Sequence, residues 1–261
     1  MKLVALLAGL ASVSAMRAPC SCAEKGQIAL VFSDGPVQAT PEVLTTLAND
    51  NISATFMFST VNIDHTGVTD VIKQTVEEGH TVGLRTNPIY DFSSMSEDDI
   101  REAITMELNV LNEVAGQQTK YITINQPDVN NQTVLKVIDE LDLVLINYNY
   151  DMYGLDDDSE DILNRWRLKL SSVRPQSTSY IVLQHDQRES ELQIVPDVVK
   201  YGSEAGFTFV NLDNCLDGVT MDNGSGNDGE VGAVIEPVKN KKNSAAAPAL
   251  ALACLVALLA M

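Results

Sequence analysis

The sequence predicts an α/β protein whose single domain is a (β/α) barrel with about seven parallel strands. Short apolar runs of strand length recur along the chain, and the segments between them carry the apolar spacing and the end signals of helices. Regular alternation of buried strands and helices is typical of a parallel sheet, and seven such units in one domain favour a barrel over an open sheet.

Each predicted strand is a run of apolar residues that is too short to form a typical helix. The first of them, Ile28–Phe32, ends in Ser33-Asp34-Gly35-Pro36 and so places one carboxylate at the end of a buried strand. The predicted strands are Ile28–Phe32, Ala54–Ser59, Thr81–Leu84, Tyr121–Ile124, Leu143–Ile146, Tyr180–Gln184 and Phe207–Leu212.

The predicted helices begin and end at residues with known helix-terminal preferences. Ser96 precedes three acidic residues, as an N-cap does, and Pro41 follows Thr40 at a first helical position. Gly79 and Gly206 are placed to end two helices. The predicted helices are Pro41–Asn49, Val68–Glu78, Glu97–Ala115, Gln132–Leu141, Asp158–Leu170 and Gln193–Ala205.

Polar side chains gather at the carboxyl ends of the predicted strands, where barrels of this class place their working groups. They are expected to lie around one cleft. These residues are Asp34, Arg85, Thr123, Asn149 and His185.

Both ends of the chain look like targeting or anchoring segments. Residues 1–15 combine one lysine, an apolar run and small residues, which predicts a secretory signal peptide. Residues 244–261 are small residues followed by a hydrophobic tail, which predicts a GPI-attachment signal with Asn243 or Ser244 as the attachment residue. A C-terminal transmembrane anchor is the alternative. We therefore expect a secreted protein at the cell surface, anchored to the plasma membrane through GPI.

One folded domain is expected between these ends. Residues 16–26 are assigned to an N-terminal segment and residues 27–216 to the domain. Residues 217–243 are rich in Gly, Asn and Asp without a period, which predicts a flexible acidic stalk.

The charge of the chain limits its partners. Its formal net charge is -19, whereas a nucleic-acid or anionic-membrane partner requires clustered Lys and Arg. No nucleic acid is expected as a partner, while a neutral or a cationic polymer remains open.

Three cysteines flank the domain, two just before its first strand and one just after its last. A disulfide from Cys20 or Cys22 to Cys215 is expected in an oxidising compartment. Local pairing of Cys20 with Cys22, or metal binding by this pair, stays open, although a lone CxC is a weak zinc signal. Asn-X-Ser/Thr triplets at Asn51, Asn131 and Asn223 are candidate glycosylation sites.

Five segments, IALVFSDGP, ISATFMF, VIKQTVEEGHTVG, MSEDDIREAI and YIVLQHD, together resemble the polysaccharide deacetylase family (NodB-like, carbohydrate esterase family 4). This group contains chitin and peptidoglycan deacetylases, and the likeness points to the spore-wall chitin-deacetylase-like members. It covers Gln27–Leu216. The resemblance implies a distorted (β/α) barrel and hydrolysis of N-acetyl groups on N-acetylglucosamine polymers. It also implies a zinc or cobalt ion, a carboxylate base and a general acid.

The first two family motifs are altered at the residues that carry this chemistry. Where the family has Thr-Phe-Asp-Asp-Gly, the base position is Ser33 and only the metal-ligand position, Asp34, is kept. The two metal-binding histidines of the second motif correspond to Arg85 and Ile89. Neither side chain offers a lone pair to a metal. We expect no metal cofactor, and we expect Arg85 to pair with Asp34 in its place.

The remaining motifs are altered in a correlated way. The family arginine that orients the base and the tyrosine after it correspond to Thr123 and Gln126. Asn149 is aligned with the aspartate that holds this arginine and supports the general acid. His185 matches that general acid, although an isolated histidine at a strand end is more often structural.

Three functions are compatible with these substitutions. The favoured one is a catalytically inactive relative that serves as a wall component or binds chitin or another wall glycan. The others are an active chitin deacetylase with an altered, metal-free site, and an enzyme of different chemistry in the same cleft. Tyr148, Tyr150 and Tyr153 follow a strand end and either stack on sugar rings or pack a loop.

Overall fold

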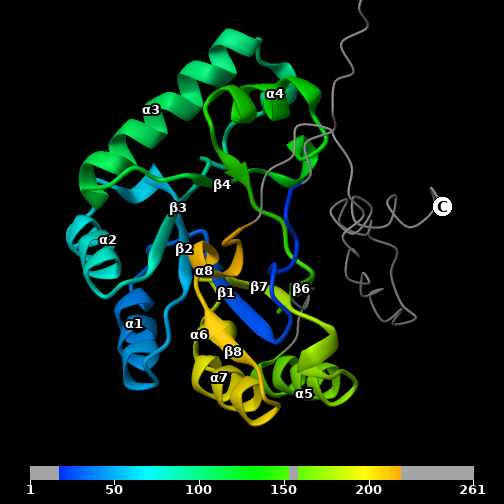
Figure 1. Ribbon diagram of the computed structural model, residues 1–261. Coiled ribbons are helices and arrows are strands. Elements are labelled where there is room, and N and C mark those ends of the chain that lie inside the picture. Colours follow the sequence, from blue (N-terminus) through cyan, green and yellow to red (C-terminus); the bar gives the residue numbers. More distant parts are fainter. Residues whose placement is uncertain (1–17, 153–157, 219–261) are drawn as a thin grey trace, which may run out of the picture.

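The computed structural model describes residues 18–152 and 158–218 (Figure 1). The predicted signal peptide, the GPI-attachment signal, nearly all of the predicted stalk, the sequon at Asn223 and the side chain of Tyr153 lie outside these residues. No helix in the described part is long and apolar enough to cross a bilayer.

All strands of the sheet pair in parallel, in the order β5-β4-β3-β2-β1-β7-β6, with β8 beside β1 (Figure 1). The predicted fold class is confirmed, with one added strand, β6, that the sequence pattern did not predict. The sheet curves as a barrel, but no pairing joins β5 to β6 in the part of the chain described here, so the barrel is open there. The strands are β1 Gln27–Ser33, β2 Thr55–Phe58, β3 Thr81–Arg85, β4 Tyr121–Thr123, β5 Val144–Leu145, β6 Tyr150–Asp151, β7 Tyr180–His185 and β8 Thr208–Val210.

β1 is the central strand because it has neighbours along both edges. β7 pairs with it over Ile28–Ser33, the whole of one edge. The other edge is shared: β8 pairs with the first half of β1 and β2 with the second half. Both faces of β1 are also covered, because Ile28, Leu30 and Phe32 belong to one apolar core and the alternating Ala29 and Val31 to another. This explains why its sequence is a continuous apolar run.

Helices cover the outer face of the sheet, as the alternating pattern predicts (Figure 1). The Ser96 hydroxyl accepts a hydrogen bond from the Asp99 amide, as expected for an N-cap. The last long predicted helix begins at Val195, and a short helix before it was not predicted. The helices are α1 Thr40–Asn49, α2 Val68–Glu77, α3 Glu97–Ala115, α4 Gln132–Glu140, α5 Ser159–Ser171, α6 Glu189–Leu192, α7 Val195–Glu204 and α8 Leu212–Cys215, with 3-10 turns η1 Thr60–Asn62, η2 Phe92–Ser94, η3 Gln126–Asp128 and η4 Pro175–Ser177.

Two apolar cores follow from the alternation of side chains along the strands. The larger core lies between sheet and helices and includes the stacked rings of Phe32 and Phe56, 4.9 Å apart. The smaller core fills the barrel and includes Val31, Tyr121 and Leu183. Side chains two residues apart in a strand share a face. The residues two positions after these three therefore also point into the barrel, at its upper end. They are Ser33, Thr123 and His185.

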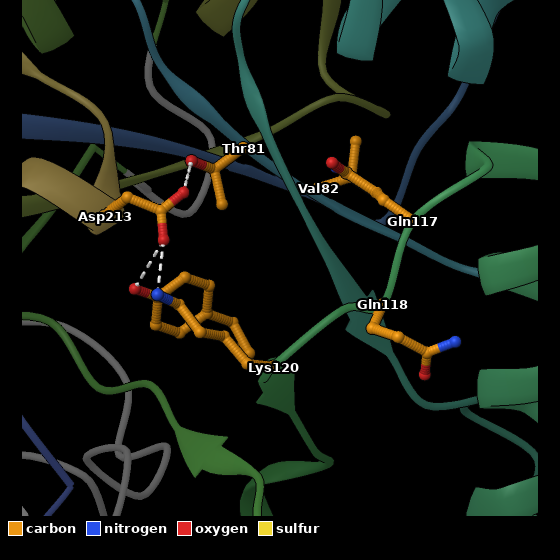
Figure 2. Close-up of a pocket in the computed structure, with 7 residues that line it drawn as sticks. Thr81, Val82, Gln117, Gln118, Lys120 and Asp213 are labelled. Atoms are coloured by element: carbon orange, nitrogen blue, oxygen red, sulfur yellow. Dashed lines mark hydrogen bonds and ion pairs between the residues drawn. The ribbon is translucent and has the colours of Figure 1, made fainter.

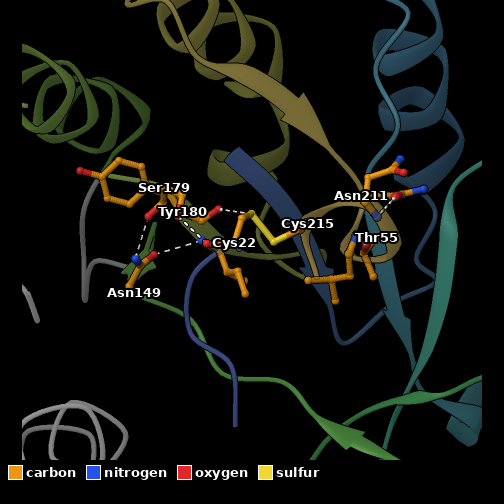
Figure 3. Close-up of a disulfide and its surroundings, with 10 residues drawn as sticks. Cys22, Thr55, Asn149, Ser179, Tyr180, Asn211 and Cys215 are labelled. Carbon is orange, nitrogen blue, oxygen red and sulfur yellow. Dashed lines mark hydrogen bonds between the residues drawn. A yellow bond between two sulfur atoms is a disulfide. The ribbon is translucent and has the colours of Figure 1, made fainter. Parts of the chain in front are cut away.

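The last helix, α8, closes the barrel at the amino ends of the strands. Leu212 and Cys215 belong to the inner core, and the Leu212 amide donates to the Thr55 hydroxyl at 2.9 Å (Figure 3). Asp213 accepts hydrogen bonds from Thr81 at 2.6 Å and from Tyr121 at 3.1 Å. α8 thus bonds the carboxyl-terminal end of the domain to β2, β3 and β4.

A disulfide between Cys22 and Cys215 fixes this closure (Figure 3). It confirms the predicted link between the two ends of the domain and decides between the two candidates, since Cys20 is buried outside the disulfide. A small polar cavity of about 240 Å³ lies beside α8, lined by Lys120 and Asp213 among others (Figure 2). It is at the barrel end opposite the strand ends that carry the predicted site residues.

Candidate functional site

The candidate site is built on the turn after β1. Asp34 has a left-handed backbone conformation, with φ at 76°, which is uncommon outside glycine. Gly35 follows in close packing, because a Cβ there would lie 2.1 Å from the Asp186 carboxylate. The peptide bond between Gly35 and Pro36 is cis. This short turn holds the Asp34 carboxylate over the upper end of the barrel.

Arg85, at the end of β3, forms the ion pair with Asp34 that the sequence predicts. Its Nε atom lies 2.9 Å from Oδ1 of Asp34. Nη2 donates to the Asn125 side chain at 2.9 Å, and Nη1 donates to the Thr86 carbonyl at 3.2 Å. The guanidinium is therefore held by partners on three sides, and its side chain is only 15% exposed. The prediction that a cation compensates Asp34 is confirmed.

His185, at the end of β7, lies between two carboxylates. Nδ1 is 2.9 Å from Oδ2 of Asp34, and Nε2 is 3.7 Å from Oδ1 of Asp151. Burial acts to lower the pKa of His185, but hydrogen bonding to Asp151 and Asp34 outweighs it and raises this pKa to about 10. The imidazole is therefore protonated at neutral pH, and such a cation cannot accept a proton as a general base.

Asp34 thus accepts from two cations at once. Burial acts to raise its pKa, but the hydrogen bond from His185 and the charge of Arg85 outweigh burial and lower the pKa below its ordinary value. The carboxylate stays ionised at neutral pH, and both of its oxygens are engaged by the protein itself.

A second layer of acidic side chains supports His185 from behind. Glu191 accepts from the His185 amide at 2.7 Å, and the Asp186 amide donates to the Ser33 carbonyl at 2.9 Å. The Asp186 carboxyl is buried and accepts from the Thr40 hydroxyl at 3.2 Å. Burial raises the pKa of Asp186 to about 8. Asp186 is therefore mostly neutral at pH 7, so it adds little charge beneath Asp34.

The alignment of Asn149 with the family aspartate implies that His185 has lost its acidic partner, but in the structure a different residue supplies a carboxylate there. The Asn149 side chain donates to the Ser179 carbonyl at 2.9 Å and accepts from the Ile181 amide at 3.0 Å, so it is bound to the lower edge of β7 (Figure 3). Asp151, two residues later on β6, is the acid beside His185. Asn149 stands one residue before β6, and a strand rises about 3.3 Å per residue, so Asp151, two residues further along, reaches the level of the histidine.

The other predicted site residues separate into floor and rim. Ser33 is buried at the floor of the site. The Thr123 hydroxyl is buried there without a hydrogen-bond partner among the described residues. Gln126 reaches the Tyr148 hydroxyl at 3.5 Å. Ile89 lies on the loop after β3 and is 78% exposed, so its apolar side chain faces solvent.

The two described tyrosines of the predicted cluster differ in their accessibility to a ligand. Tyr150 is buried and packs on Trp166 at a ring distance of 5.0 Å, so it belongs to the core and cannot stack on a ligand. Tyr148 is half-buried, and burial together with the nearby Asp151 raises its pKa. Among the described tyrosines of this group, Tyr148 alone is available to a ligand.

The residues at this site do not fit the metal ion that the sequence resemblance implies. Asp34 is the one ligand position kept, and it is saturated by Arg85 and His185. The two histidine positions hold Arg85 and the exposed Ile89, which have no donor for a metal. No group of three or more His, Cys, Asp or Glu side chains is arranged to hold a metal ion within residues 18–152 and 158–218.

Two candidate glycosylation sites are in different settings. Asn51 is exposed, with a φ of 54°, in the turn after α1. Asn131 is the N-cap of α4, where its Oδ1 atom accepts from the amides of Thr133 and Val134. Sequence inspection ranks the two sites equally, whereas the structure gives Asn51 the more accessible side chain.

Asp151 and the two buried acids behind the histidine, Asp186 and Glu191, were not identified from the sequence as parts of the site. Asp151 belongs to a two-residue strand, β6, which is too short to produce a recognisable pattern. Asp186 stands directly after His185, but its burial against Thr40 depends on α1 folding over it. The available signal was the concentration of polar residues after Asn147, which does not identify which carboxylate faces the histidine.

The family is decided by comparison with known proteins. A family model described as polysaccharide deacetylase matches residues 21–146. The chain contains a polysaccharide deacetylase domain. A peptidoglycan-N-acetylglucosamine deacetylase of Bacillus cereus is 28% identical to this deacetylase domain over 171 residues, which are 65% of this chain and 59% of the relative. The match therefore spans less than two thirds of that relative's length.

Solved structures share the fold of the deacetylase domain. The chitin deacetylase of Colletotrichum lindemuthianum superposes with a TM-score of 0.67 at 23% identity, over 76% of this chain and 90% of that one. A pseudoenzyme of carbohydrate esterase family 4 from Bacillus anthracis superposes with a TM-score of 0.64 at 18% identity, over 74% and 66%. At these identities the comparisons establish the NodB-type (β/α) barrel and not an activity.

Proposed function

We propose that this chain is a non-catalytic polysaccharide deacetylase homologue that acts as a wall component or glycan-binding module at an outer cell surface. The observation that carries the proposal is the ion pair between Arg85 and Asp34, at the position where the family resemblance implies a metal ligand. Arg85, which is bonded on three sides, takes the position of the implied metal ion and compensates the negative charge of Asp34 in its place.

The loss of the base supports the same proposal. Amide hydrolysis needs a group that takes a proton from the attacking water, and Ser33 offers a neutral hydroxyl in place of a carboxylate. Asp34 is ionised but is held by two cations, and His185 is already protonated. A base and a metal each contribute several kcal/mol to such a reaction, and this site supplies neither. The structural likeness to a pseudoenzyme of the family is compatible with this proposal.

The alternative function is an active deacetylase that uses a metal-free site. One observation favours it: His185 is still placed between Asp34 and Asp151, and a protonated imidazole could donate a proton to a leaving amine. The alternative fails to provide an activated water, which is why we place it second.

One preparation decides between the two functions. Metal content and acetate release are measured on the same purified protein, with chitooligosaccharides and O-acetylated sugars as substrates and with zinc or cobalt added. We expect no bound metal and no acetate above a buffer control. Turnover that disappears in the His185→Ala variant would overturn the proposal.

Glycan binding is tested separately, by pull-down on insoluble chitin. Gln126 lies beside Tyr148 at the candidate site, and Gln118 lies at the opposite end of the barrel (Figure 2). We expect enrichment over an uncharged control protein, reduced by Gln126→Ala and unchanged by Gln118→Ala. Equal enrichment of the control protein would count against glycan binding.

The proposed location rests on the sequence. The predicted signal peptide and GPI-attachment signal place the domain outside the plasma membrane, facing the cell or spore wall. The disulfide between Cys22 and Cys215 supports an oxidising compartment. Release of the protein from cells by a phosphatidylinositol-specific phospholipase tests the anchor, and release by detergent alone would favour a transmembrane tail.

A further inference from the structure

The cations of this acidic chain are unevenly distributed. Some of the twelve lysines and arginines in the described residues pair with carboxylates, as Arg101 and Lys136 do. Six of them form no ion pair within 4 Å with a described carboxylate: Lys25, Lys73, Arg167, Lys169, Arg174 and Lys200. Four of these six belong to α5, to the loop after it, or to α7.

Two of these four, Arg167 on α5 and Lys200 on α7, lie over the same ring, that of Tyr201, and we name the surface that they form the α5–α7 edge. α5 and α7 lie side by side (Figure 1). The guanidinium of Arg167 lies 5.0 Å from the centre of the Tyr201 ring, and the ammonium of Lys200 lies 5.9 Å from the same centre. A single ring on α7 thus brings cations from both helices together.

The segment of chain that carries Arg167 contains no acidic residue. Residues 162–185 contain four Lys and Arg and no Asp or Glu, in a chain of formal charge -19. Arg167 and Arg174 are exposed, as are the intervening Ser171 and Ser172. Asp197 and Glu204 flank Lys200 on α7, but neither forms an ion pair with it. Unpaired cations in such a background are the electrostatic footprint of an anionic ligand.

The net charge of the chain does not cancel this local field. At physiological ionic strength the Debye length is about 8 Å, so acids on distant faces of the domain are screened from a ligand at the edge. A ligand with closely spaced anionic groups gains from several cations at once and releases its counterions.

We infer that the α5–α7 edge binds an anionic polysaccharide, a polymer carrying sulfate, phosphate or carboxylate groups. This surface is separate from the cleft of His185 and does not depend on the proposed function. A lipid surface fits less well, because membrane-binding helices bury several apolar side chains and Leu168, at 70% exposure, is the one large exposed hydrophobic residue on this edge. A second copy of the chain also fits less well, because it would bring a further net charge of -19 and the two copies would repel each other. The disulfide favours an extracellular polymer over a nucleic acid.

The test measures binding of the full domain to heparin, used as a sulfated polysaccharide, and to neutral dextran of similar length. We expect binding to heparin that weakens with salt, and no binding to dextran. Arg167→Gln/Lys200→Gln should weaken heparin binding by about tenfold or more. Arg167→Lys/Lys200→Arg keeps the charges and should bind like the wild type. The matched control, Lys73→Gln/Lys136→Gln, removes the same charge from α2 and α4 and should change binding by less than about twofold.

Several outcomes would overturn the inference. They are absence of heparin binding, an equal loss in the control double variant, and tighter binding to a DNA duplex or to phosphatidylserine vesicles than to heparin. A concentration-dependent increase in mass that Arg167→Gln/Lys200→Gln abolishes would assign the edge to self-association instead. Circular dichroism and the melting temperature of each variant establish that it folds.

Discussion

His185 and Asp34 are joined across neighbouring strands, with Nδ1 of the histidine 2.9 Å from Oδ2 of the aspartate. The register of β1 and β7 sets this distance, since Ser33 stands opposite His185. The contact turns the carboxylate at the end of β1 from an open ligand into one arm of a closed network of Arg85, Asp34, His185 and Asp151.

The first prediction concerns the charge state of His185. Asp34→Asn and Asp151→Asn each remove a carboxylate that favours the imidazolium, so each should lower the pKa of His185 from about 10. An NMR pH titration of the imidazole resonances measures the change. The buried His80, away from this network, should titrate as in the wild type, and an unchanged His185 pKa in both variants would contradict the proposed network.

The second prediction concerns Arg85 as a structural cation. Arg85→Met leaves Asp34 with one partner fewer in a site where these side chains are 15% and 25% exposed. We expect the free energy of unfolding to fall by about 1–3 kcal/mol. Urea denaturation measures it. Arg174→Met, which removes an exposed arginine without an ion pair, should cost less than about 0.5 kcal/mol; an equal loss in both variants would remove the special role of Arg85.

The third prediction concerns the restoration of a metal site. Ser33→Asp/Arg85→His/Ile89→His places a carboxylate and two imidazoles at the family positions and removes the cation that holds Asp34. We expect the triple variant to bind about one zinc per chain, with release by a chelator, whereas the wild type and Arg85→Gln/Ile89→Gln bind none. Zinc bound equally by the wild type would show that the native donor set was misjudged.

The fourth prediction concerns the dependence of stability on pH. The folded pKa of His185 is raised to about 10 and that of Asp186 to about 8, so the native state binds more protons than the unfolded chain. The stabilisation by His185 is complete below its unfolded pKa of about 6.5 and is lost as pH rises toward about 10. The penalty from ionising Asp186 grows between pH values of about 4 and 8.

The melting temperature should therefore fall as pH rises from about 6 to 10. Asp186→Asn removes the ionisation and keeps an acceptor for Thr40, so it should flatten the decline below pH values of about 8. Glu102→Gln, on the exposed face of α3, should leave the slope unchanged. Stability that rises through this range would contradict both assignments.

The fifth prediction concerns the closure of the barrel. The disulfide joins residues 193 positions apart, so its removal frees a long loop in the unfolded chain. Cys22→Ala/Cys215→Ala should lower the free energy of unfolding by about 2–5 kcal/mol, measured by urea denaturation. Cys20→Ala, which opens no loop, should cost less than half as much, and a reversed order would contradict the pairing.

Local sequence patterns determined the alternating elements, because hydrophobic runs and helix-end residues act over a few positions. They also determined the chemistry of Ser33, Arg85 and Ile89, since a residue type that lacks a lone pair cannot bind a metal in any fold. The pairing of Arg85 with Asp34 was predicted because the family resemblance places both residues at the positions of one metal site and their charges are opposite.

Only the tertiary structure decided which neighbours meet. Asn149 and Asp151 are two residues apart in the chain, and the register of β6 against β7 set which of them reaches His185. Cys22 and not Cys20 meets Cys215 for the same kind of reason, because the path of α8 across the barrel end fixes the distance. Register and helix placement depend on contacts between distant residues, which a pattern along the chain does not contain.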